Sequence, residues 1–273
     1  MKKAVLLVSF GTSYAEAREN SLESIYQELS AAGGAIPVYQ AYTSGVIIRK
    51  LAGRQIQIDT VEEAVRKVLD HQVQCLYVVP THMIPGIEYQ KLVRILEPYR
   101  SSFEKMEITS AVLNQKEDCK KLVPVLQDIF QFQRENYYVL MGHGTEDGAN
   151  IRYTQMNEAF IEAGLTNVQI ASVEARPNLA DAISYLQNAG KVDKVVVHPF
   201  MVVAGDHARN DMAGETDSYA AKLREEGYEV LAIVKGLGEY PQFRRIYVEK
   251  LQEMLGKCNN EAESQIVAGK TDE

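Results

Sequence analysis

Short apolar runs alternate with longer amphipathic segments along most of the chain. The runs are rich in β-branched residues and are apolar at successive positions, as in strands that are covered on both faces of a sheet. They predict strands at residues 4–9, 38–43, 75–80, 106–110, 137–141, 168–173, 194–199 and 230–234. The amphipathic segments predict helices at residues 15–31, 61–69, 89–99, 116–132, 180–189, 211–226 and 241–255. This alternation indicates an α/β protein with parallel sheets and right-handed crossovers.

Three short segments of the first half recur in the same order in the second half. The matched residues are 8–12 with 141–145, 38–44 with 168–174, and 79–86 with 198–205. Each match is short, so their shared order is the stronger evidence for a duplication. We expect two similar lobes, each with a four-stranded parallel sheet flanked by helices. The predicted lobes are residues 1–133 and 134–257, with the last helix packing back on the first lobe and a polar, frayed tail at 258–273.

Composition and charge narrow the class of protein. The 273 residues are 46% hydrophobic and 24% charged, as in an ordinary globular protein long enough for two compact domains. The net charge of −8 disfavours a nucleic-acid partner. No apolar run approaches the roughly 18 residues that span a bilayer, so no membrane segment is expected. The absence of a GxGxxG or GxxxxGKS loop argues against a nucleotide cofactor.

The N-terminus and the cysteines bear on the cellular compartment. Lys2 and Lys3 precede a short apolar run, as in a signal peptide, but no small-residue cleavage site follows. We interpret the run as the first buried strand of a cytoplasmic protein. Cys75, Cys119 and Cys258 are far apart and lack CxxC spacing, which predicts reduced thiols and argues against a zinc ribbon or a disulfide framework.

Three potential metal ligands follow predicted strands of the second half, namely His143, Glu174 and His207. Ligands bind beyond the carboxyl ends of parallel strands, so these side chains are expected to meet at one edge of the sheet. Two imidazoles and one carboxylate suit a first-row divalent ion with open coordination positions. Gly142 and Gly144 would let a bulky ligand approach the backbone closely.

Each of these residues also has a structural explanation when it is taken alone. A histidine between two glycines is more often a turn residue or a hydrogen-bonded structural group. Glu174 could be a helix N-terminal or solvated carboxylate. His207 could belong to a capping loop, with Asn210 or Asp211 as the cap. The convergence of all three residues on one edge is what favours a metal site.

Five segments carry a resemblance that extends over nearly the whole chain, to about residue 255. They are SFGTS at the end of residues 1–13, TSGVIIRKL at 43–51, MGHG at 141–144, VVAGDHARNDM at 202–212 and GLGE at 236–239. Together they resemble the anaerobic sirohydrochlorin cobalt chelatases, class II chelatases that work without ATP and are related in fold to ferrochelatase. The Ala-Gly-Asp-His block within the fourth segment is the most specific part.

The resemblance implies a fold of two lobes with the tetrapyrrole in the cleft between them. It implies insertion of Co²⁺, as the substrate metal, into sirohydrochlorin with release of two protons, in anaerobic cobalamin (vitamin B12) biosynthesis. It also implies that the family's His–Glu–His metal triad lies at His143, Glu174 and His207, where the sequence shows no departure. The tail beyond Cys258 is not part of the resemblance.

The first half lacks the complete triad. Phe10 and Ser44 stand in the places of the first histidine and the glutamate, and only Glu88 falls in the place of the second histidine. We therefore expect the first lobe to be a wall for the substrate, with Phe10 stacking on the macrocycle and nearby hydroxyl groups offering hydrogen bonds. Those hydroxyl groups belong to Ser9, Thr12, Ser13 and Tyr14.

Other side chains are candidates for binding the substrate. His82 is either a second axial or proton-accepting group in the cleft or a structural histidine. A substrate with many carboxylates needs local cations in an acidic protein, because guanidinium groups pair bidentately with carboxylates. The candidates, each of which could equally be a solvated surface residue, are Arg49, Lys50, Arg54, Arg152, Arg176 and Arg209. Arg176 and Arg209 are preferred because each lies two residues from a triad member.

The chemistry leaves rival functions open. Both histidines must be neutral to bind an ion, and Glu174 would complete the ion's shell or accept a pyrrole proton. Imidazole and carboxylate do not select one metal, so insertion of iron or nickel into a related tetrapyrrole is one alternative. A non-catalytic tetrapyrrole or metal carrier is another. A periplasmic-binding-type ligand module is a third, which the missing signal peptide disfavours. The sequence also leaves a homo-oligomer open.

Overall fold

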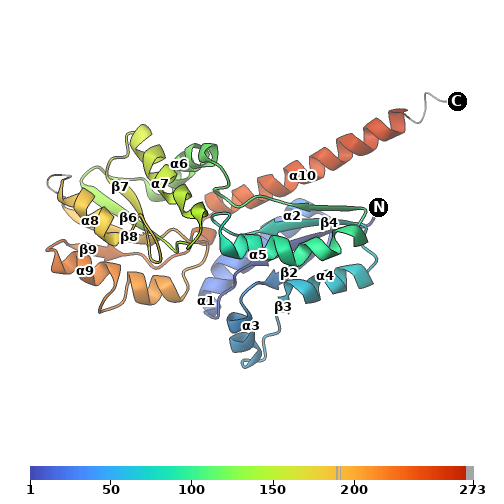
Figure 1. Cartoon of the computed structure of the whole chain (residues 1–273), viewed down its shortest axis with the longest axis horizontal. Helices are drawn as coiled ribbons and strands as arrows, with labels where there is room; N and C mark the ends of the chain where they lie inside the picture. Colours follow the sequence, from blue (N-terminus) through green and yellow to red (C-terminus); the bar gives the residue numbers. More distant parts are fainter. Residues whose placement is uncertain (189, 191, 269–273) are drawn as a thin grey trace.

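The protein folds into two parallel β-sheets flanked by helices (Figure 1). The computed structural model describes residues 1–188, 190 and 192–268, with side chains described up to residue 256. Within these residues the first sheet has the strand order β3-β2-β1-β4-β5 and the second has the order β7-β6-β8-β9. The strands are β1 Lys3–Ser9, β2 Val38–Tyr42, β3 Asp59–Thr60, β4 Cys75–Pro80, β5 Lys105–Ile108, β6 Asn136–Gly142, β7 Val168–Ser172, β8 Lys194–Pro199 and β9 Val230–Ala232.

Helices of three kinds connect the strands. The α-helices are α1 Ala15–Ala17, α2 Ser24–Gly33, α3 Gly45–Ala52, α4 Val61–Asp70, α5 Ile87–Leu96, α6 Lys116–Phe130, α7 Ile151–Glu162, α8 Leu179–Gln187, α9 Tyr219–Glu225 and α10 Pro241–Ala268. Two π-helices, η1 Arg18–Glu23 and η4 Ala208–Met212, and three 3-10 helices, η2 Glu97–Ser102, η3 Gly148–Asn150 and η5 Leu237–Glu239, complete the described elements. None of the described helices combines the length and the apolar character that crossing a bilayer requires.

The eight predicted strands are all present, and all are parallel as expected. The prediction of four strands in each sheet is correct for the second sheet and wrong for the first, where the described residues form five strands. The additional strand is β3, which pairs only two residues, Asp59 and Thr60, with the end of β2. A strand of this length leaves no hydrophobic pattern, so the sequence does not reveal it.

The helix predictions fail at four helices. They omit α3 and α7 altogether. The helix predicted at 211–226 is wrong in its first half, because α9 begins after Ser218, whose hydroxyl accepts from the Ala221 N–H at 3.0 Å. The predicted end at residue 255 is also wrong, since α10 continues to residue 268 where a frayed tail was expected. The predicted helix end at residue 189, the side chain of Cys258 and residues 269–273 lie outside the described part of the chain.

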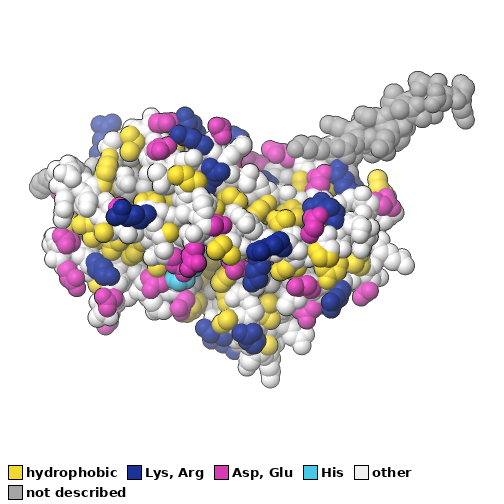
Figure 2. Space-filling view, in the orientation of Figure 1, with side chains coloured by type: hydrophobic (Ala, Val, Ile, Leu, Met, Phe, Trp, Pro, Cys, Tyr) yellow, Lys and Arg dark blue, Asp and Glu magenta, His cyan; other side chains and the backbone are white. Residues whose placement is uncertain are grey.

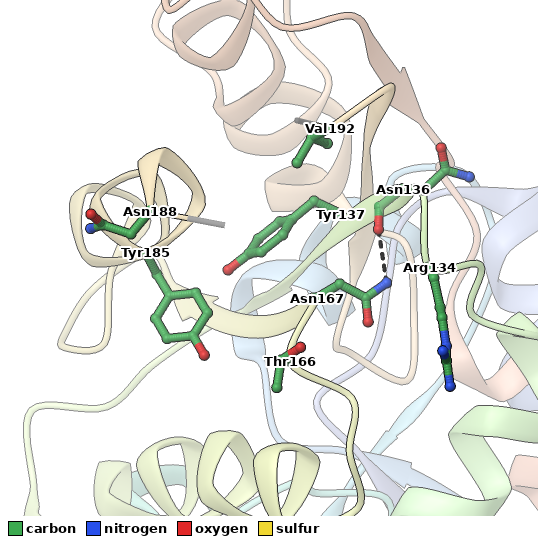
Figure 3. A pocket seen from close by; sticks show the side chains of 8 residues that line it. All are labelled: Arg134, Asn136, Tyr137, Thr166, Asn167, Tyr185, Asn188 and Val192. Atoms are coloured by element: carbon green, nitrogen blue, oxygen red, sulfur yellow. Dashed lines mark hydrogen bonds between the residues drawn. The ribbon is translucent and has the colours of Figure 1, made fainter. Parts of the chain in front are cut away.

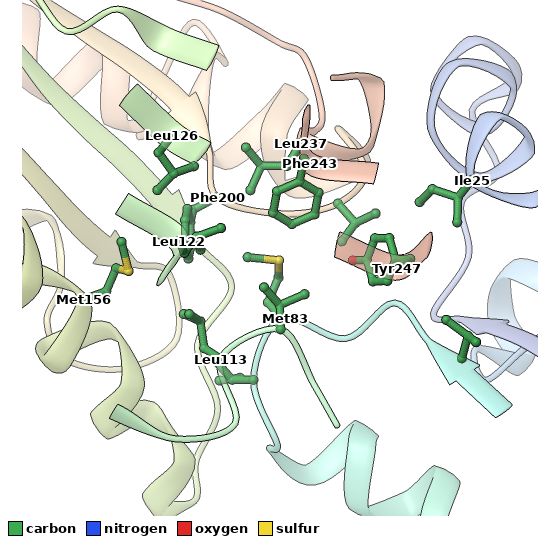
Figure 4. Close-up of a cluster of buried hydrophobic side chains, with 14 of the residues drawn as sticks. Ile25, Met83, Leu113, Leu122, Leu126, Met156, Phe200, Leu237, Phe243 and Tyr247 are labelled. Atoms are coloured by element: carbon green, nitrogen blue, oxygen red, sulfur yellow. The ribbon is translucent and has the colours of Figure 1, made fainter. Parts of the chain in front are cut away.

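Both faces of each sheet are buried, which is why the strands are apolar at successive positions. Alternate residues of β1 contribute to different clusters: Val5 and Leu7 to one, Leu6 and Val8 to another. The first of these clusters also contains Leu140 of β6, so it is a core shared by the two sheets. Figure 4 shows part of this core, where side chains from both halves and from α10 pack together. The two sheets are therefore joined by packing as well as by the chain.

Helix α10 follows the second sheet in sequence and packs on the first. It contacts α2 and β4, and the Tyr247 hydroxyl donates to the Thr81 carbonyl at 3.1 Å. The Lys250 amine donates to the carbonyl oxygens of Ser110 and Ala111, both at 2.7 Å, just beyond β5. Burial lowers the pKa of Lys250 to about 8. The last helix thus completes the first half of the molecule.

The internal repeat predicted from the sequence is visible in backbone hydrogen bonds. The Thr81 N–H donates to the Val8 carbonyl at 2.9 Å, and at the matched positions the Phe200 N–H donates to the Met141 carbonyl at 2.7 Å. Each bond joins the residue after one strand to the end of its neighbour. The same register therefore recurs at the carboxyl edge of both sheets.

His198 is fully buried in β8 as a satisfied neutral imidazole. Its Nδ1 lies 2.8 Å from the Pro199 carbonyl oxygen and its Nε2 lies 3.1 Å from the Tyr240 hydroxyl oxygen. A neutral ring with its proton on Nδ1 donates to the carbonyl and accepts from the hydroxyl. The Phe130 ring packs edge-on with its centroid 4.7 Å away. Burial lowers the pKa of His198 from 6.5 to about 4.

Acid should therefore destabilise the fold through His198. His198 takes up a proton near pH 6.5 in the unfolded chain and only near pH 4 in the folded protein. The contribution of His198 to the free energy of unfolding is therefore complete above pH 6.5 and is lost as the pH falls to 4. The loss is about 3 kcal/mol at pH 4. The variant His198→Gln cannot titrate, and denaturant unfolding at pH 7 and pH 4 should show a correspondingly smaller pH dependence of its stability. His71→Gln, at an exposed position, is the control. An unchanged pH dependence in His198→Gln would contradict this assignment.

Candidate functional site

His143 stands one residue beyond the end of β6, at the carboxyl edge of the second sheet. Its Nδ1 lies 3.1 Å from the Gly144 carbonyl oxygen. A Cβ at Gly142 would lie 2.9 Å from the Tyr153 ring, and one at Gly144, where φ is +95°, would lie 3.1 Å from the Ala175 backbone nitrogen. Both glycines are therefore required by packing within the protein, which is a different reason from the ligand approach expected from the sequence.

Glu174 is placed beside His143 by the backbone. The ladder between β6 and β7 continues past the strand ends, because the Val173 N–H donates to the Gly142 carbonyl and the Glu174 N–H to the His143 carbonyl, each at 3.0 Å. As a result the Glu174 Oε2 lies 3.5 Å from the His143 Nδ1. A carboxylate and an imidazole thus share this edge of the sheet, as the sequence predicts.

His207 approaches the same histidine from the loop after β8. It directly precedes η4, and its ring centroid lies 4.5 Å from that of His143, with the two ring planes at 87°. Its Nδ1 lies 2.6 Å from the Asp211 Oδ2. The side chains of His143, Glu174 and His207 are between 38% and 46% exposed, so solvent and a ligand can reach them.

The predicted triad therefore converges on His143, but it is not a preformed metal cage. As they stand, no three His, Cys, Asp or Glu side chains among the described residues have metal-binding geometry. Glu174 lies on the Nδ1 edge of His143, the edge that also faces the Gly144 carbonyl. The Nε2 atoms of His143 and His207 accept and donate no hydrogen bond within the described chain. An ion held by both Nε2 atoms would require the Glu174 side chain to turn toward it.

The loop that carries His207 is held against the first lobe. The Tyr14 hydroxyl donates to the Asp206 Oδ1 at 2.9 Å. The Arg209 guanidinium lies over the Tyr14 ring, 4.7 Å from its centroid, and 4.0 Å from the Glu16 carboxylate. A phenol, a guanidinium and two carboxylates thus link the two lobes beside His207.

The lobes meet through matched positions of the repeat. A Cβ on Gly205 would lie 3.8 Å from the Thr12 hydroxyl, and a Cβ on Gly86 would lie 3.0 Å from the Thr145 hydroxyl. In each contact a glycine of one lobe faces the threonine of the other lobe's first strand end. Glu88, in the place of His207, follows Gly86 at the start of α5 and lies 3.9 Å from the Lys91 amine.

The predicted wall residues differ in exposure. The Phe10 side chain is 47% exposed at the end of β1, as stacking on a ligand would require. Ser9 and Thr12 are almost completely buried, and the Thr12 hydroxyl accepts from the Tyr14 backbone N–H at 3.2 Å. The Ser13 carbonyl accepts from the Arg54 guanidinium at 2.7 Å. Phe10, Ser13 and Tyr14 are thus the wall residues that a substrate could reach.

His82 lies in a different environment from the other candidate histidines. Both ring nitrogens are buried without a hydrogen-bond partner in the described structure, and the Tyr89 ring packs edge-on with its centroid 6.0 Å away. Burial lowers the pKa of His82 to about 4. No hydrogen bond or ion pair within the described residues links it to the three predicted ligands.

The candidate cations are distributed unevenly. Arg176 pairs with Asp181 at 3.2 Å and is 78% exposed, while Arg209 stands over Tyr14 at the junction of the lobes. Arg152 donates to the Gln155 amide oxygen at 2.6 Å. Arg54 is engaged by the first lobe's own backbone, as described above, and Arg49 and Lys50 are exposed on α3. Arg209 is the candidate cation whose contacts, through the Tyr14 ring, belong to the junction of the lobes beside His207.

Three acidic residues at the site are apparent only in the structure. They are Asp206, Asp211 and Glu16, which lie in or beside the His207 loop and make the contacts given above. The sequence offers a signal for Asp211 alone, because its spacing of four residues from His207 brings side chains together on a helix. On the face drawn in Figure 2, histidine surface is bordered by Asp and Glu side chains. Such an acidic edge attracts a divalent cation before any ligand bond forms.

A surface cavity of about 570 Å³ lies at the opposite edge of the second sheet (Figure 3). It is lined by Arg134, Asn136, Tyr137, Thr166, Asn167, Tyr185, Asn188 and Val192. These residues lie near the amino-terminal ends of β6 and β7, and none of them is a predicted site residue. The cavity is therefore separate from the histidine site.

Comparison with known proteins identifies the family of this chain. A family model described as cobalt chelatase (CbiK) matches residues 3–256. The chain is 34% identical over 265 residues to the sirohydrochlorin cobaltochelatase of Salmonella typhimurium, which covers 96% of this chain and 100% of that relative. It is 28% identical to the sirohydrochlorin cobaltochelatase CbiKC of Nitratidesulfovibrio vulgaris, which covers 92% of this chain and 89% of that relative.

Solved structures share the fold. SirB from Bacillus subtilis with Fe³⁺ has a TM-score of 0.62 at 16% identity, over 93% of this chain and 95% of that chain. The sirohydrochlorin chelatase SirB from Bacillus subtilis subspecies spizizenii in complex with cobalt has a TM-score of 0.58 at 14% identity, with the same coverage. The expected two-sheet α/β fold and the resemblance drawn from the sequence motifs are thus confirmed, and this protein belongs to the cobalt chelatase (CbiK) family.

Proposed function

We propose that this protein inserts Co²⁺ into sirohydrochlorin without a nucleotide, in the cytoplasm and as a step of cobalamin biosynthesis. The observation that carries the proposal is the contact between the His143 and His207 rings, whose centroids are 4.5 Å apart. The two imidazoles stand at the carboxyl edge of one sheet, beside side chains of the other lobe. The name of the relative that is 34% identical over 96% of the chain supports the choice of metal and tetrapyrrole.

His143 and His207 are proposed to receive the ion through their Nε2 atoms. In each ring Nδ1 faces an oxygen atom, at 3.1 Å for His143 and 2.6 Å for His207. A proton on Nδ1 satisfies those oxygens and leaves the Nε2 lone pair for the metal. Two neutral imidazoles with open coordination positions bind a divalent ion without enclosing it, so that it can pass to the pyrrole nitrogens.

Glu174 is proposed as the third ligand or as the acceptor of a pyrrole proton. Metallation breaks two pyrrole N–H bonds, releases two protons and forms bonds from the pyrrole nitrogens to Co²⁺, so the charge brought by the ion leaves as protons. A carboxylate 3.5 Å from one imidazole and partly exposed is positioned to take the first proton or to balance the arriving ion. Its side chain reaches the ion only after it turns away from the Nδ1 edge of His143.

The first lobe is proposed to hold the macrocycle opposite the ligands. Phe10 occupies the place in the repeat that His143 occupies in the other lobe, and its exposed ring offers a flat surface. Arg209, with its Nε buried and without a partner in the described structure, is proposed to pair with a substrate carboxylate in exchange for its long contact with Glu16. Arg176 is a second, more exposed candidate. We propose residues 1–133 and 134–257 as the two lobes.

Loss of either histidine should abolish chelation without unfolding the protein. His143→Ala and His207→Ala each remove one ligand from a partly exposed position, so kcat/KM for cobalt insertion should fall at least about 100-fold. Circular dichroism and the denaturation midpoint should stay close to wild type. The measurement is the change in the ultraviolet–visible spectrum as sirohydrochlorin takes up Co²⁺.

His71→Ala is the matched control for these variants, because His71 is exposed and belongs to the turn after α4 of the first lobe. It should insert cobalt at the wild-type rate. Full activity in either His143→Ala or His207→Ala would remove that histidine from the proposed mechanism.

Turnover separates an enzyme from a carrier. With sirohydrochlorin and Co²⁺ both in tenfold excess over protein, all of the tetrapyrrole should be metallated, because the incomplete ligand set releases its metal. The same assay with Fe²⁺ and Ni²⁺ tests the choice of metal, since these ligands do not exclude either ion. Product formation that stops at one metallated tetrapyrrole per protein molecule would identify a carrier instead.

A further inference from the structure

A short polar contact at the candidate site joins His207 to a residue outside the predicted triad. The His207 Nδ1 lies 2.6 Å from the Asp211 Oδ2; His207 directly precedes η4, and Asp211 lies four residues later within it. Asp211 is not a helix cap, because it lies within η4 and the next helix is capped by the Ser218 hydroxyl. The helix-capping role that the sequence suggests for Asp211 therefore does not explain its carboxylate.

We propose that Asp211 is a positioning residue that holds the His207 imidazole with its proton on Nδ1 and its Nε2 lone pair toward the incoming Co²⁺. This inference rests on the proposed function, in which His207 is a metal ligand. A carboxylate that accepts from the far nitrogen of an imidazole fixes the tautomer and the ring orientation and makes the ring a better donor to a metal. Asp211 itself does not touch the ion or the tetrapyrrole.

The two histidines differ in what orients them. The His143 Nδ1 faces a backbone carbonyl, that of Gly144, which the fold holds in place, with Glu174 at a longer distance. The His207 Nδ1 has only the Asp211 carboxylate among the described residues. Besides its packing against the His143 ring, the His207 ring is thus oriented by the hydrogen bond to a single side chain, and removing that side chain should affect this histidine alone.

The backbone around His207 has its own supports, which a change at Asp211 leaves intact. Asp206 accepts from the Tyr14 hydroxyl, and Arg209 lies over the Tyr14 ring. These contacts tie the loop to the first lobe on both sides of His207. A variant at Asp211 should therefore change the imidazole without displacing the loop.

The test uses the full chain with Co²⁺ alone as the probe, so that it does not depend on tetrapyrrole insertion. Asp211→Ala and Asp211→Leu remove the acceptor, and the second, which leaves no empty space, is used should the first fail to fold. Co²⁺ affinity, followed by the visible absorption of the protein-bound ion, should fall about 10- to 100-fold in both. Asp211→Asn keeps an acceptor oxygen and should recover most of that loss. Glu215→Ala, an exposed carboxylate four residues further along, is the control and should bind as wild type.

A spectroscopic readout distinguishes positioning from general stability. In the metal-free protein, ¹⁵N shifts of the His207 ring should report the Nδ1–H tautomer in wild type and in Asp211→Asn, and a mixture of tautomers in Asp211→Ala and Asp211→Leu. In the chelation assay kcat should fall while KM for sirohydrochlorin stays within about twofold, because Asp211 acts through the metal ligand.

The outcomes separate this inference from the function beneath it. The role of Asp211 would be overturned if Asp211→Ala and Asp211→Leu kept the wild-type Co²⁺ affinity and the His207 tautomer while His207→Ala bound Co²⁺ weakly. The proposed chelatase function would then still stand. Wild-type Co²⁺ affinity in His207→Ala would instead overturn the ligand assignment, and the role of Asp211 with it.

Discussion

The hydrogen-bond ladder between β6 and β7 continues past the ends of both strands, as far as His143 and Glu174, and the arrangement of the candidate site depends on it. The Val173 and Glu174 N–H groups donate to the carbonyls of Gly142 and His143, each at 3.0 Å. A parallel ladder fixes the register of the two strands, so it sets Glu174 beside His143, and their side chains lie 3.5 Å apart. The third candidate ligand, His207, must therefore be placed beside this pair by a different segment of the chain. That segment is a loop whose contacts are made with the other lobe, which makes the relation between lobes part of the site.

The first lobe has the same ladder with different side chains. The Thr43 N–H donates to the Ser9 carbonyl at 2.9 Å and the Ser44 N–H to the Phe10 carbonyl at 3.3 Å. Phe10 thus occupies the backbone position of the first histidine, and Ser44, in the place of the glutamate, caps α3 by accepting from the Ile47 N–H at 3.4 Å. The same backbone geometry thus presents an imidazole and a carboxylate, which we propose bind a cation, in one lobe, and an apolar ring and a helix cap in the other. Side chains at equivalent strand ends can therefore serve different functions within one fold.

The long strands that are buried on both faces could be predicted, because such burial leaves an unbroken apolar run in the sequence. The proximity of His143 to Glu174 and His207 could also be predicted, from the rule that ligands bind at the carboxyl ends of parallel strands. Their roles as metal ligands remain predictions. The helix predicted at 211–226 failed because its apolar spacing suits a helix, whereas a Cβ at Gly214 would lie 2.4 Å from the Asn210 carbonyl oxygen and Ser218 starts a new helix. The contact between Asp211 and His207 could not be predicted for another reason. A carboxylate four residues from a histidine resembles any charged pair on a helix surface until the distance between the two side chains is known.

Helix α10 has a consequence for how the chain is made. Tyr247 bonds to Thr81 across 166 residues, and Lys250 caps the loop after β5 across more than a hundred. A ribosome delivers the first sheet long before the helix that covers it, so a nascent first half exposes apolar surface until α10 has been synthesised. Contacts this distant in sequence slow folding and lengthen the period in which such surface can bind the wrong neighbour. Apolar surface of the first sheet is therefore exposed to such contacts for longer than that of the second sheet, although the first sheet leaves the exit tunnel earlier.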